Sequence, residues 1–368
     1  MTNKIRVAIL CGGKSAEHEV SLQSARNIVN AIDEDKYEVV LLGIDKQGRW
    51  SLHDRSHFLL NADNPKLISL NKTTGNVALV TGESSSSEIV SLSGNESPGP
   101  VDVVFPVLHG PFGEDGTIQG LLKLMDVPFV GASVLGSAAG MDKDVMKRLL
   151  REANIPISDF LVYQKGEAHT IQFDRVKERL GAPVFIKPAN LGSSVGIHKV
   201  ASSGEFDRAI QDAFRYDRKL IIEEAVKGRE LECSVLGNED PLASIPGEII
   251  PQHEFYSYEA KYIDDQGALL EIPANLTPEG VKAVQTLAVQ TFKVLCCEGM
   301  ARVDFFLTPE DKLYVNEINT IPGFTKISMY PKLWEASGIS QTELVDRLIQ
   351  LALARFEQEK QLRTSVQL

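Results

Sequence analysis

The sequence is poor in cysteine and contains no long apolar run. Its four cysteines are Cys11, Cys233, Cys296 and Cys297, and no two of them form a C-x-x-C pair. We therefore expect free, buried thiols in a reducing cytoplasm, and neither a structural zinc site nor a disulfide framework. No apolar stretch approaches the roughly 18 residues of a membrane span. The short apolar run at residues 7–11 leads into charged sequence without a cleavage site, so no signal peptide is predicted.

Positive charge is also in short supply. The chain has 38 lysines and arginines against 50 aspartates and glutamates, which gives a net charge of −12. Because nucleic-acid binding usually requires a basic face, we expect no DNA or RNA partner. The acidity leaves nucleotide binding open, since a few lysines and Mg²⁺ can neutralise phosphates locally. The hydrophobic content of 43% and the charged content of 24% are typical of a soluble enzyme.

The N-terminal residues predict a parallel sheet. Residues 4–11 and 37–44 read as apolar strands, and residues 21–32 between them have helical spacing. A strand, helix, strand order is a βαβ unit, which implies parallel pairing. Residues 46–100 differ, because they include four consecutive serines and end in Ser-Pro-Gly-Pro. We predict a surface insertion of loops and short strands there.

The chain of 368 residues is too long for one compact core, so two or three domains are expected. Small residues at 131–140 indicate one boundary, and a second boundary is placed near residue 224. Strands and helices alternate irregularly after it, which favours a mixed α/β and α+β fold. The predicted domains are residues 1–131, 132–223 and 224–368.

A helix is predicted over residues 141–154, at the start of the second domain. Met146, Leu149, Leu150 and Ala153 have the spacing of an inward face. Lys143 lies near the start of this helix. Two interpretations are open for it: a solvated lysine, or a lysine that contacts an anionic ligand.

A loop rich in glycine and serine follows a buried strand in the second domain. Lys187 closes the strand, and Gly192-Ser193-Ser194-Val195-Gly196 follows it. Glycine permits positive φ angles, so successive backbone N–H groups can converge on an anion. The loop is not a Walker A motif, because no Gly-Lys-Ser/Thr opens a helix. It is interpreted either as a phosphate loop or as an ordinary hairpin turn.

Another buried strand ends in paired carboxylates. Residues 221–226 read Ile-Ile-Glu-Glu-Ala-Val, and Glu230 follows. This pattern suits an adenine hinge, in which the backbone pairs with the base and a carboxylate accepts from ribose hydroxyls. The alternative is a strand that reaches the surface at Glu223 and Glu224.

The segment 302–319 predicts a hairpin around a Thr-Pro-Glu-Asp turn. A turn centred between Glu310 and Asp311 places Asp304 opposite Glu317 and Arg302 opposite Asn319. Strand side chains alternate, so these four share one face, and the same register puts Phe306 and Val315 on that face near the turn.

Two carboxylates and an amide on one face, without His or Cys, suit Mg²⁺ that bridges nucleotide phosphates. The predicted metal ligands are Asp304, Glu317 and Asn319. Arg302 beside them can hold a phosphoryl group during its transfer. The alternative is a solvated polar face with a salt bridge, although opposed like charges are costly without a cation.

The loop after the first strand carries Ser15-Ala16-Glu17-His18-Glu19-Val20-Ser21. A carboxylate at the C-terminal end of that strand lies where open α/β sheets bind ligands. Glu17 is therefore a candidate ligand-binding residue. The alternative is a helix N-terminus with acids that match the helix dipole.

Together these segments resemble the D-alanine:D-alanine ligases of the ATP-grasp superfamily. The motifs that carry the resemblance run in the family's order: residues 12–21, His109-Gly110 with Gly113-Glu114-Asp115-Gly116, Lys187-Pro188 with residues 192–196, Lys261-Tyr262, Arg302-Val303-Asp304, and residues 316–323. The resemblance covers nearly the whole chain except residues 46–100. It implies a three-domain ATP-grasp fold, with a Rossmann-like N-terminal domain and ATP between the other two.

The resemblance also assigns roles by matching position. ATP is expected at Lys143, Lys187, Ser193, Glu223, Glu224, Val226, Glu230 and Lys261. Two Mg²⁺ ions, or Mn²⁺, are expected at Asp304, Glu317 and Asn319. The catalytic residues are expected to be Glu17, Ser193, Tyr262, Arg302 and Gly323, and the substrate-binding residues Glu17, His109, Ser328 and Met329. Residues 254–262 resemble a loop that closes the site.

The expected reaction activates one D-alanine as an acyl phosphate and joins it to the amine of a second, for peptidoglycan synthesis. In the resemblance, position 262 is Tyr in dipeptide-forming relatives and Phe in some that accept D-lactate. A homodimer in the cytoplasm is the expected form. Three alternatives remain open: a ligase that forms D-alanyl-D-lactate, another ATP-grasp carboxylate:amine ligase, and a nucleotide-binding module without catalysis.

Overall fold

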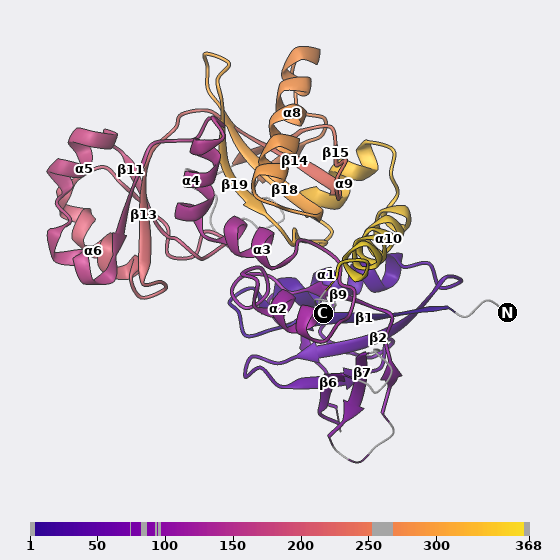
Figure 1. The fold of residues 1–368 in the computed structure, drawn as a ribbon. Helices are drawn as coiled ribbons and strands as arrows, with labels where there is room; N and C mark the ends of the chain where they lie inside the picture. Colours follow the sequence, from indigo (N-terminus) through magenta and orange to yellow (C-terminus); the bar gives the residue numbers. More distant parts are fainter. Residues whose placement is uncertain are drawn as a thin grey trace.

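The computed structural model describes residues 4–73, 75–81, 87–92, 94, 97–251 and 268–363. Its larger sheets are an N-terminal, a central and a C-terminal one, with four, four and six strands. Figure 1 shows them as three groups of elements, coloured from indigo to yellow along the chain, which meet near α3 (Val134–Met141). The candidate site residues lie around this junction.

The N-terminal sheet has the strand order β3-β2-β1-β9. Its strands are β1 (Ile5–Gly12), β2 (Tyr37–Ile44), β3 (Trp50–His53) and β9 (Val103–Val107). β1 pairs in parallel with both β2 and β9, as the βαβ pattern predicts. Helix α1 (His18–Ala31) begins at His18 and not at Ser21, and α2 (Thr117–Leu124) follows β9.

Residues 46–100 are not confined to the surface, so the prediction of a surface insertion was only partly correct. β3 pairs antiparallel with β2 and extends the main sheet. Ile89 and Val77 are buried in the same apolar cluster as Leu10 of β1. The remaining strands of the segment form two small sheets: β4 (Leu59–Leu60) with β5 (Ser69–Leu70), and β6 (Val77–Thr81) with β7 (Ser87–Ser91) and β8 (Gly99–Pro100).

The other face of the N-terminal sheet shares a core with the last helices of the chain. These are α9 (Met329–Ala336) and α10 (Gln341–Lys360). One apolar cluster includes Ile9 of β1, Ile28 of α1, Tyr330 of α9 and Leu348 of α10, all fully buried. Figure 1 shows α10 (yellow) beside α1 (indigo). Burial of this shared apolar surface ties the two ends of the chain together.

The central sheet is antiparallel in the order β10-β13-β11-β12. Its strands are β10 (Phe160–Gln164), β11 (Val184–Pro188), β12 (His198–Val200) and β13 (Lys219–Glu224). Helices α5 (Phe173–Leu180) and α6 (Ser203–Ala213) pack on it, and η1 (Lys165–Thr170) is a short 3₁₀ helix.

Helix α4 (Lys143–Glu152) leads into the central sheet, and its buried face differs from the prediction. Met146 and Leu150 are fully buried as expected, whereas Leu149 is 39% exposed and Ala153 is also exposed. Lys147 occupies part of the inward face instead and has no exposed surface. A buried cation requires a buried partner, and that partner lies in the candidate site.

The C-terminal sheet has the order β17-β16-β14-β18-β19, with β15 paired to β14. Its strands are β14 (Arg229–Gly237), β15 (Leu242–Ala243), β16 (Gly247–Pro251), β17 (Ala268–Glu271), β18 (Gly299–Leu307) and β19 (Leu313–Asn319). Helix α8 (Pro278–Val294) covers one face, where Phe292 and Val303 share a buried cluster. The opposite face turns toward the central sheet and carries the polar residues of the site.

The hairpin of β18 and β19 has the predicted register at the site but not at its turn. Arg302 pairs with Asn319 and Asp304 pairs with Glu317, as predicted. A bulge after Asp304 then shifts the register by one residue, so Phe306 pairs with Tyr314. Val315 consequently faces the apolar core rather than the polar face, which corrects the prediction for that residue.

All four cysteines are free. Cys11, Cys233 and Cys297 are buried as expected, whereas Cys296 is exposed. None of the helices in the described part of the chain is long and apolar enough to cross a membrane.

Candidate active site

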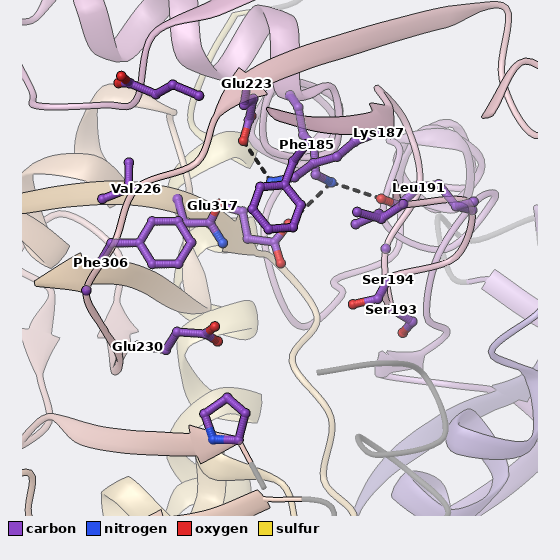
Figure 2. Close-up of a pocket in the computed structure, with 17 residues that line it drawn as sticks. Phe185, Lys187, Leu191, Ser193, Ser194, Glu223, Val226, Glu230, Phe306 and Glu317 are labelled. Carbon is purple, nitrogen blue, oxygen red and sulfur yellow. Dashed lines mark hydrogen bonds and ion pairs between the residues drawn. The ribbon is translucent and has the colours of Figure 1, made fainter. Parts of the chain in front are cut away.

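A cavity lies between the central and C-terminal sheets, and we call it the inter-sheet cavity (Figure 2). Seven of the eight residues predicted for nucleotide contacts line it: Lys143, Lys187, Ser193, Glu223, Glu224, Val226 and Glu230. The eighth, Lys261, lies outside the described residues. The sheets thus bring together residues that are spread over almost 90 positions from 143 to 230.

Two aromatic side chains that the sequence did not single out for this cavity also line it. Phe185 comes from β11 and Phe306 from β18. Figure 2 shows both rings among the polar side chains. Apolar walls with a few polar groups are typical of pockets for planar ring ligands. Period-two alternation from Lys187 would have identified Phe185, because it lies two positions earlier on the same strand.

A buried ion cluster supports one wall of this cavity. Nζ of Lys187 lies 2.7 Å from Oε2 of Glu223, and Nζ of Lys147 lies 3.2 Å from Oε1. Lys147 also donates to the hydroxyl of Ser158 at 2.7 Å. Lys147 was missed in the sequence because a lysine at a helix position ordinarily indicates a solvated face.

The cluster changes the ionisation of its members. Burial would raise the pKa of Glu223, but the charges of Lys147 and Lys187 outweigh it and lower that pKa to about 2. Burial lowers the pKa of Lys147, and Glu223 offsets only part of this. Burial also lowers the pKa of Lys187, but the ion pair with Glu223 outweighs this effect and raises the pKa above its ordinary value. Glu223 is therefore ionised and Lys187 remains a cation in the cavity.

Lys143 is buried as well, which excludes the solvated interpretation. Asp142 caps α4 by accepting from the N–H groups of Asp144 and Val145, and it also binds Lys219 of β13 at 2.6 Å. This arrangement attaches the start of α4 to the central sheet. Nζ of Lys143 then donates to the carbonyl of Leu191 at 2.9 Å and lies 3.3 Å from Oε2 of Glu317.

The glycine-serine loop has the backbone of an anion site. Ser193, Ser194 and Gly196 all have positive φ angles, at 53°, 59° and 69°. Non-glycine residues rarely adopt this conformation, and it is found where function constrains the chain. The hydroxyl of Ser193 donates to Oε1 of Glu17, so the loop is bonded to the start of α1.

Three carboxylates form a row across the C-terminal sheet. Glu232 of β14 pairs with Asp304 of β18, and Asp304 pairs with Glu317 of β19. Arg302 lies among them, with Nε 2.8 Å from Oε2 of Glu232 and Nη2 2.7 Å from Oδ2 of Asp304. Glu232 was not identified in the sequence, because the pairing of β14 with β18 joins strands that are far apart in the chain.

The predicted metal ligands belong to this row. Nδ2 of Asn319 donates to Oδ2 of Asp304 at 3.2 Å, and Glu317 lines the inter-sheet cavity. The three carboxylates here face the cations Arg302 and Lys143, and the charge of Lys187 also acts on Glu317. Within the described ranges no three His, Cys, Asp or Glu side chains form a group that could hold a metal ion. The two carboxylates and the amide oxygen nevertheless suit a hard cation.

A second cavity adjoins this row, and we call it the Arg302 cavity. Six of the predicted catalytic and substrate-binding residues line it, together with the predicted metal ligands Glu317 and Asn319: Glu17, Ser193, Arg302, Gly323, Ser328 and Met329. Gly192, Ser193 and Glu317 line both cavities, so the two spaces meet there. Tyr262, also predicted here, lies outside the described residues, as do residues 254–261.

Glu114 lines the Arg302 cavity. The sequence placed it in the motif of residues 113–116 but assigned it no role. Its two oxygens accept from the N–H groups of Gly110 at 2.7 Å and Ile321 at 3.1 Å. Burial and the nearby charge of Glu17 raise the pKa of Glu114 to about 8. Its role could have been suspected from the sequence, because Glu114 lies in the same polar loop as His109, directly after a buried strand.

His109 lines neither the inter-sheet cavity nor the Arg302 cavity, and its assignment as a substrate-binding residue stays a prediction. Its ring is buried, with Nδ1 2.9 Å from the carbonyl of Ile321 and Nε2 3.1 Å from the hydroxyl of Ser24. Burial lowers the pKa of His109 to about 4, so the ring is neutral at neutral pH. It supports the loop that contains Gly323.

Comparison with known proteins assigns the family. The family model described as D-ala D-ala ligase N-terminus matches residues 6–132, and the one described as D-ala D-ala ligase C-terminus matches residues 149–350. The D-alanine--D-alanine ligase of Oceanobacillus iheyensis is 57% identical over 98% of this chain and 99% of its own. D-alanine--D-alanine ligase A of Escherichia coli K12 is 52% identical over 99% and 100%.

Solved structures agree with this assignment. The D-alanine-D-alanine ligase from Coxiella burnetii has a TM-score of 0.82 and 40% identity, over 97% of this chain and 96% of its own. The VanG D-Ala:D-Ser ligase from Enterococcus faecalis also has a TM-score of 0.82, with 35% identity over 95% and 100%. These likenesses confirm the mixed α/β ATP-grasp fold, and this chain belongs to the D-alanine–D-alanine ligase family.

Proposed function

We propose that the protein joins two D-alanine molecules to D-alanyl-D-alanine, with conversion of ATP to ADP and phosphate, as a step of peptidoglycan precursor synthesis. The observation that carries the proposal is the junction of the two cavities at Ser193 and Glu317. A nucleotide in the inter-sheet cavity can present its terminal phosphate there to a carboxylate bound in the Arg302 cavity. Such proximity is the main requirement of phosphoryl transfer.

In the first step, a carboxylate oxygen of the first D-alanine attacks the γ-phosphorus of ATP, and ADP leaves. The product is D-alanyl phosphate. Lys143 and Lys187 bind phosphate oxygens, while Glu223, Glu224, Val226 and Glu230 line the adenosine. Glu17 receives the ammonium group of the first D-alanine. Its carboxylate is buried and held by Ser193, which fixes it for that contact.

The carboxylate row fits the metal that the family implies. Asp304, Glu317 and Asn319 supply the hard oxygen ligands that a divalent cation prefers. These residues would hold two Mg²⁺ ions, with Mn²⁺ as a substitute. When bound, Mg²⁺ neutralises charge on the β- and γ-phosphates. Arg302 contributes a guanidinium that can bind the phosphoryl oxygens from the same face.

In the second step, the amine of the second D-alanine attacks the acyl carbon, loses a proton, and displaces phosphate. Arg302 and the backbone N–H of Gly323 stabilise the oxygen of the tetrahedral intermediate. Ser328 and Met329 stand at the start of α9, where the positive end of the helix dipole favours the second carboxylate. From the family resemblance, we propose that Tyr262 and Lys261 belong to the loop that closes the site.

The identity of the second substrate, which accepts the D-alanyl group, most needs a test, because one similar structure is a D-Ala:D-Ser ligase. Phosphate release from ATP is measured with D-alanine alone and with D-alanine plus D-lactate or D-serine, and chromatography identifies the products. L-alanine and a mixture without any acceptor are the controls. We expect release with D-alanine and D-alanyl-D-alanine as the main product. A main product other than this dipeptide would overturn the proposed acceptor.

We further propose that the enzyme acts in the cytoplasm, where ATP is supplied, and that it forms a homodimer. Free thiols throughout the described chain agree with a reducing compartment. Analytical ultracentrifugation tests the dimer, and a single species with the mass of one chain would overturn it.

A further inference from the structure

Two N-terminal side chains bind both backbone groups of Ile321. Oε1 of Glu114 accepts from its N–H at 3.1 Å, and Nδ1 of His109 lies 2.9 Å from its carbonyl oxygen. A carbonyl oxygen can only accept, so Nδ1 of His109 carries the proton. The backbone of Ile321 is therefore held by two hydrogen bonds from loops that lie more than 200 positions earlier in the chain.

Two further N-terminal side chains bind both backbone groups of Phe324. Oγ of Ser24 accepts from its N–H at 3.0 Å, and Nδ2 of Asn27 donates to its carbonyl at 2.7 Å. Both residues belong to α1, three positions apart and therefore on one face of the helix. We call Ser24, Asn27, His109 and Glu114 together the backbone clamp.

The two halves of the clamp are linked to each other. The neutral His109 ring has its proton on Nδ1, so Nε2 accepts from the hydroxyl of Ser24 at 3.1 Å. That hydroxyl in turn accepts from the N–H of Phe324. Each donor in this series of hydrogen bonds meets one acceptor, and hydrogen bonds linked in this way hold the participating groups in a single arrangement.

The clamp encloses a single backbone donor. Between Ile321 and Phe324 the chain contains only Pro322 and Gly323, and proline has no N–H group. Gly323 lines the Arg302 cavity. A Cβ atom at this position would approach Oγ of Ser328 to 2.8 Å, so the loop lies close to the predicted carboxylate site.

We propose that the backbone clamp positions the Gly323 N–H for the tetrahedral intermediate, so that residues outside the reacting centre determine the acyl-transfer step. The inference rests on the proposed function, because it assigns a role within that reaction. A donor aimed in advance at developing charge needs no reorganisation during reaction, and small displacements of such a donor are costly. The clamp also makes this donor depend on contact between the N-terminal and C-terminal domains.

The test uses Asn27→Asp, which keeps the side-chain size but places an oxygen against the carbonyl of Phe324. The matched control is Asn238→Asp, because Asn238 makes the same kind of bond to the carbonyl of Leu351 at 3.1 Å and lines neither cavity. In the full-length enzyme at pH 8, we expect the kcat for dipeptide formation to fall at least tenfold in Asn27→Asp, as a rough estimate for a misplaced donor. The KM for ATP should change less than about twofold, because the inter-sheet cavity is untouched.

A second readout separates positioning from general loosening. Acyl phosphate formation is followed by exchange of ¹⁸O between the bridging and non-bridging positions of the β-phosphate of ATP in the presence of D-alanine. This exchange should persist in Asn27→Asp while the dipeptide rate falls, because the clamp acts on the second step. An equal fall of both rates, or a dipeptide rate equal to that of Asn238→Asp, would overturn the proposal.

A pair of variants at His109 keeps the proposal testable if Asn27→Asp fails to fold. His109→Asn keeps an N–H donor near the Nδ1 position, whereas His109→Leu removes it. We expect the kcat of the Asn variant to exceed that of the Leu variant by about tenfold, which corresponds to one retained hydrogen bond. Equal kcat values would overturn the clamp. If the unaltered enzyme formed no dipeptide, the proposed function would fail first, and the clamp assignment would fall with it.

Discussion

The inter-sheet cavity and the Arg302 cavity meet at Ser193 and Glu317, yet they are built in different ways. The inter-sheet cavity takes most of its side chains from strands of the central and C-terminal sheets and from loops next to them, with Lys143 from the start of α4. The Arg302 cavity needs the N-terminal loops, the glycine-serine loop, β18 and the start of α9 at once. The first cavity therefore depends mainly on the central and C-terminal sheets, whereas the second also requires contact with the N-terminal loops.

This difference teaches where each kind of substitution should act. A change in the inter-sheet cavity should alter nucleotide affinity with little effect on amino-acid binding. A change at the junction should stop both steps, and a change in the backbone clamp should alter the second step alone.

The largest effect is expected where the cavities join. Glu317→Gln removes a charge that faces both cavities, so turnover should fall by more than about a hundredfold. The fold should persist, because the core of the hairpin is apolar. Phosphate release and the melting temperature check this, with the exposed Glu343→Gln as control. Near-normal activity at ordinary Mg²⁺ would remove Glu317 from the metal site.

A change confined to the inter-sheet cavity comes next. Lys187→Ala should weaken ATP binding by roughly tenfold or more through loss of a charge-assisted contact. The KM for D-alanine should stay nearly unchanged. Titration calorimetry measures the first quantity, and Lys199→Ala on the exposed side of the same sheet is the control. Unchanged ATP affinity would make the glycine-serine loop a structural turn.

On the amino-acid side, Tyr262→Phe should change the choice of acceptor. The family resemblance implies a hydrogen bond from the Tyr262 hydroxyl to Ser193, and the structure bonds Ser193 to Glu17. Loss of one such bond shifts a ratio of competing acceptors by about tenfold. The D-lactate share should rise most at lower pH, where the competing amine is protonated. The product ratio across a pH series tests this, and an unchanged ratio would limit Tyr262 to loop closure.

The smallest effect concerns stability in acid. The pKa of Glu223 is lowered to about 2 in the folded protein, below its ordinary value of 4.5. A lowered pKa stabilises the fold above the unfolded value, and this contribution is lost as the pH falls from about 4.5 toward 2. Lys147→Met should therefore flatten the decline of the unfolding free energy in that range. Denaturant unfolding at several pH values measures it, and parallel declines in both proteins would contradict the prediction.

The polar face of the hairpin could be predicted from the sequence because it depends on local rules. The alternation of side chains and the position of the turn placed Asp304 opposite Glu317 and Arg302 opposite Asn319. The same rules failed beyond Asp304, because a bulge adds one residue to a strand and no sequence period announces it. Val315 was misplaced for that reason.

Tertiary structure alone decided the support of the site. The position of Lys147 in the sequence predicts a solvated lysine, but the packing of α4 against β13 buries it beside Glu223. The clamp on Ile321 and Phe324 joins residues between 207 and 300 positions apart. His109 was assigned to substrate by the family resemblance alone, and its contacts with Ile321 and Ser24 are visible only in the folded structure. Local patterns specify strands, turns and the residues on one face, whereas long-range hydrogen bonds depend on how the separate sheets and their loops pack, which no short segment encodes.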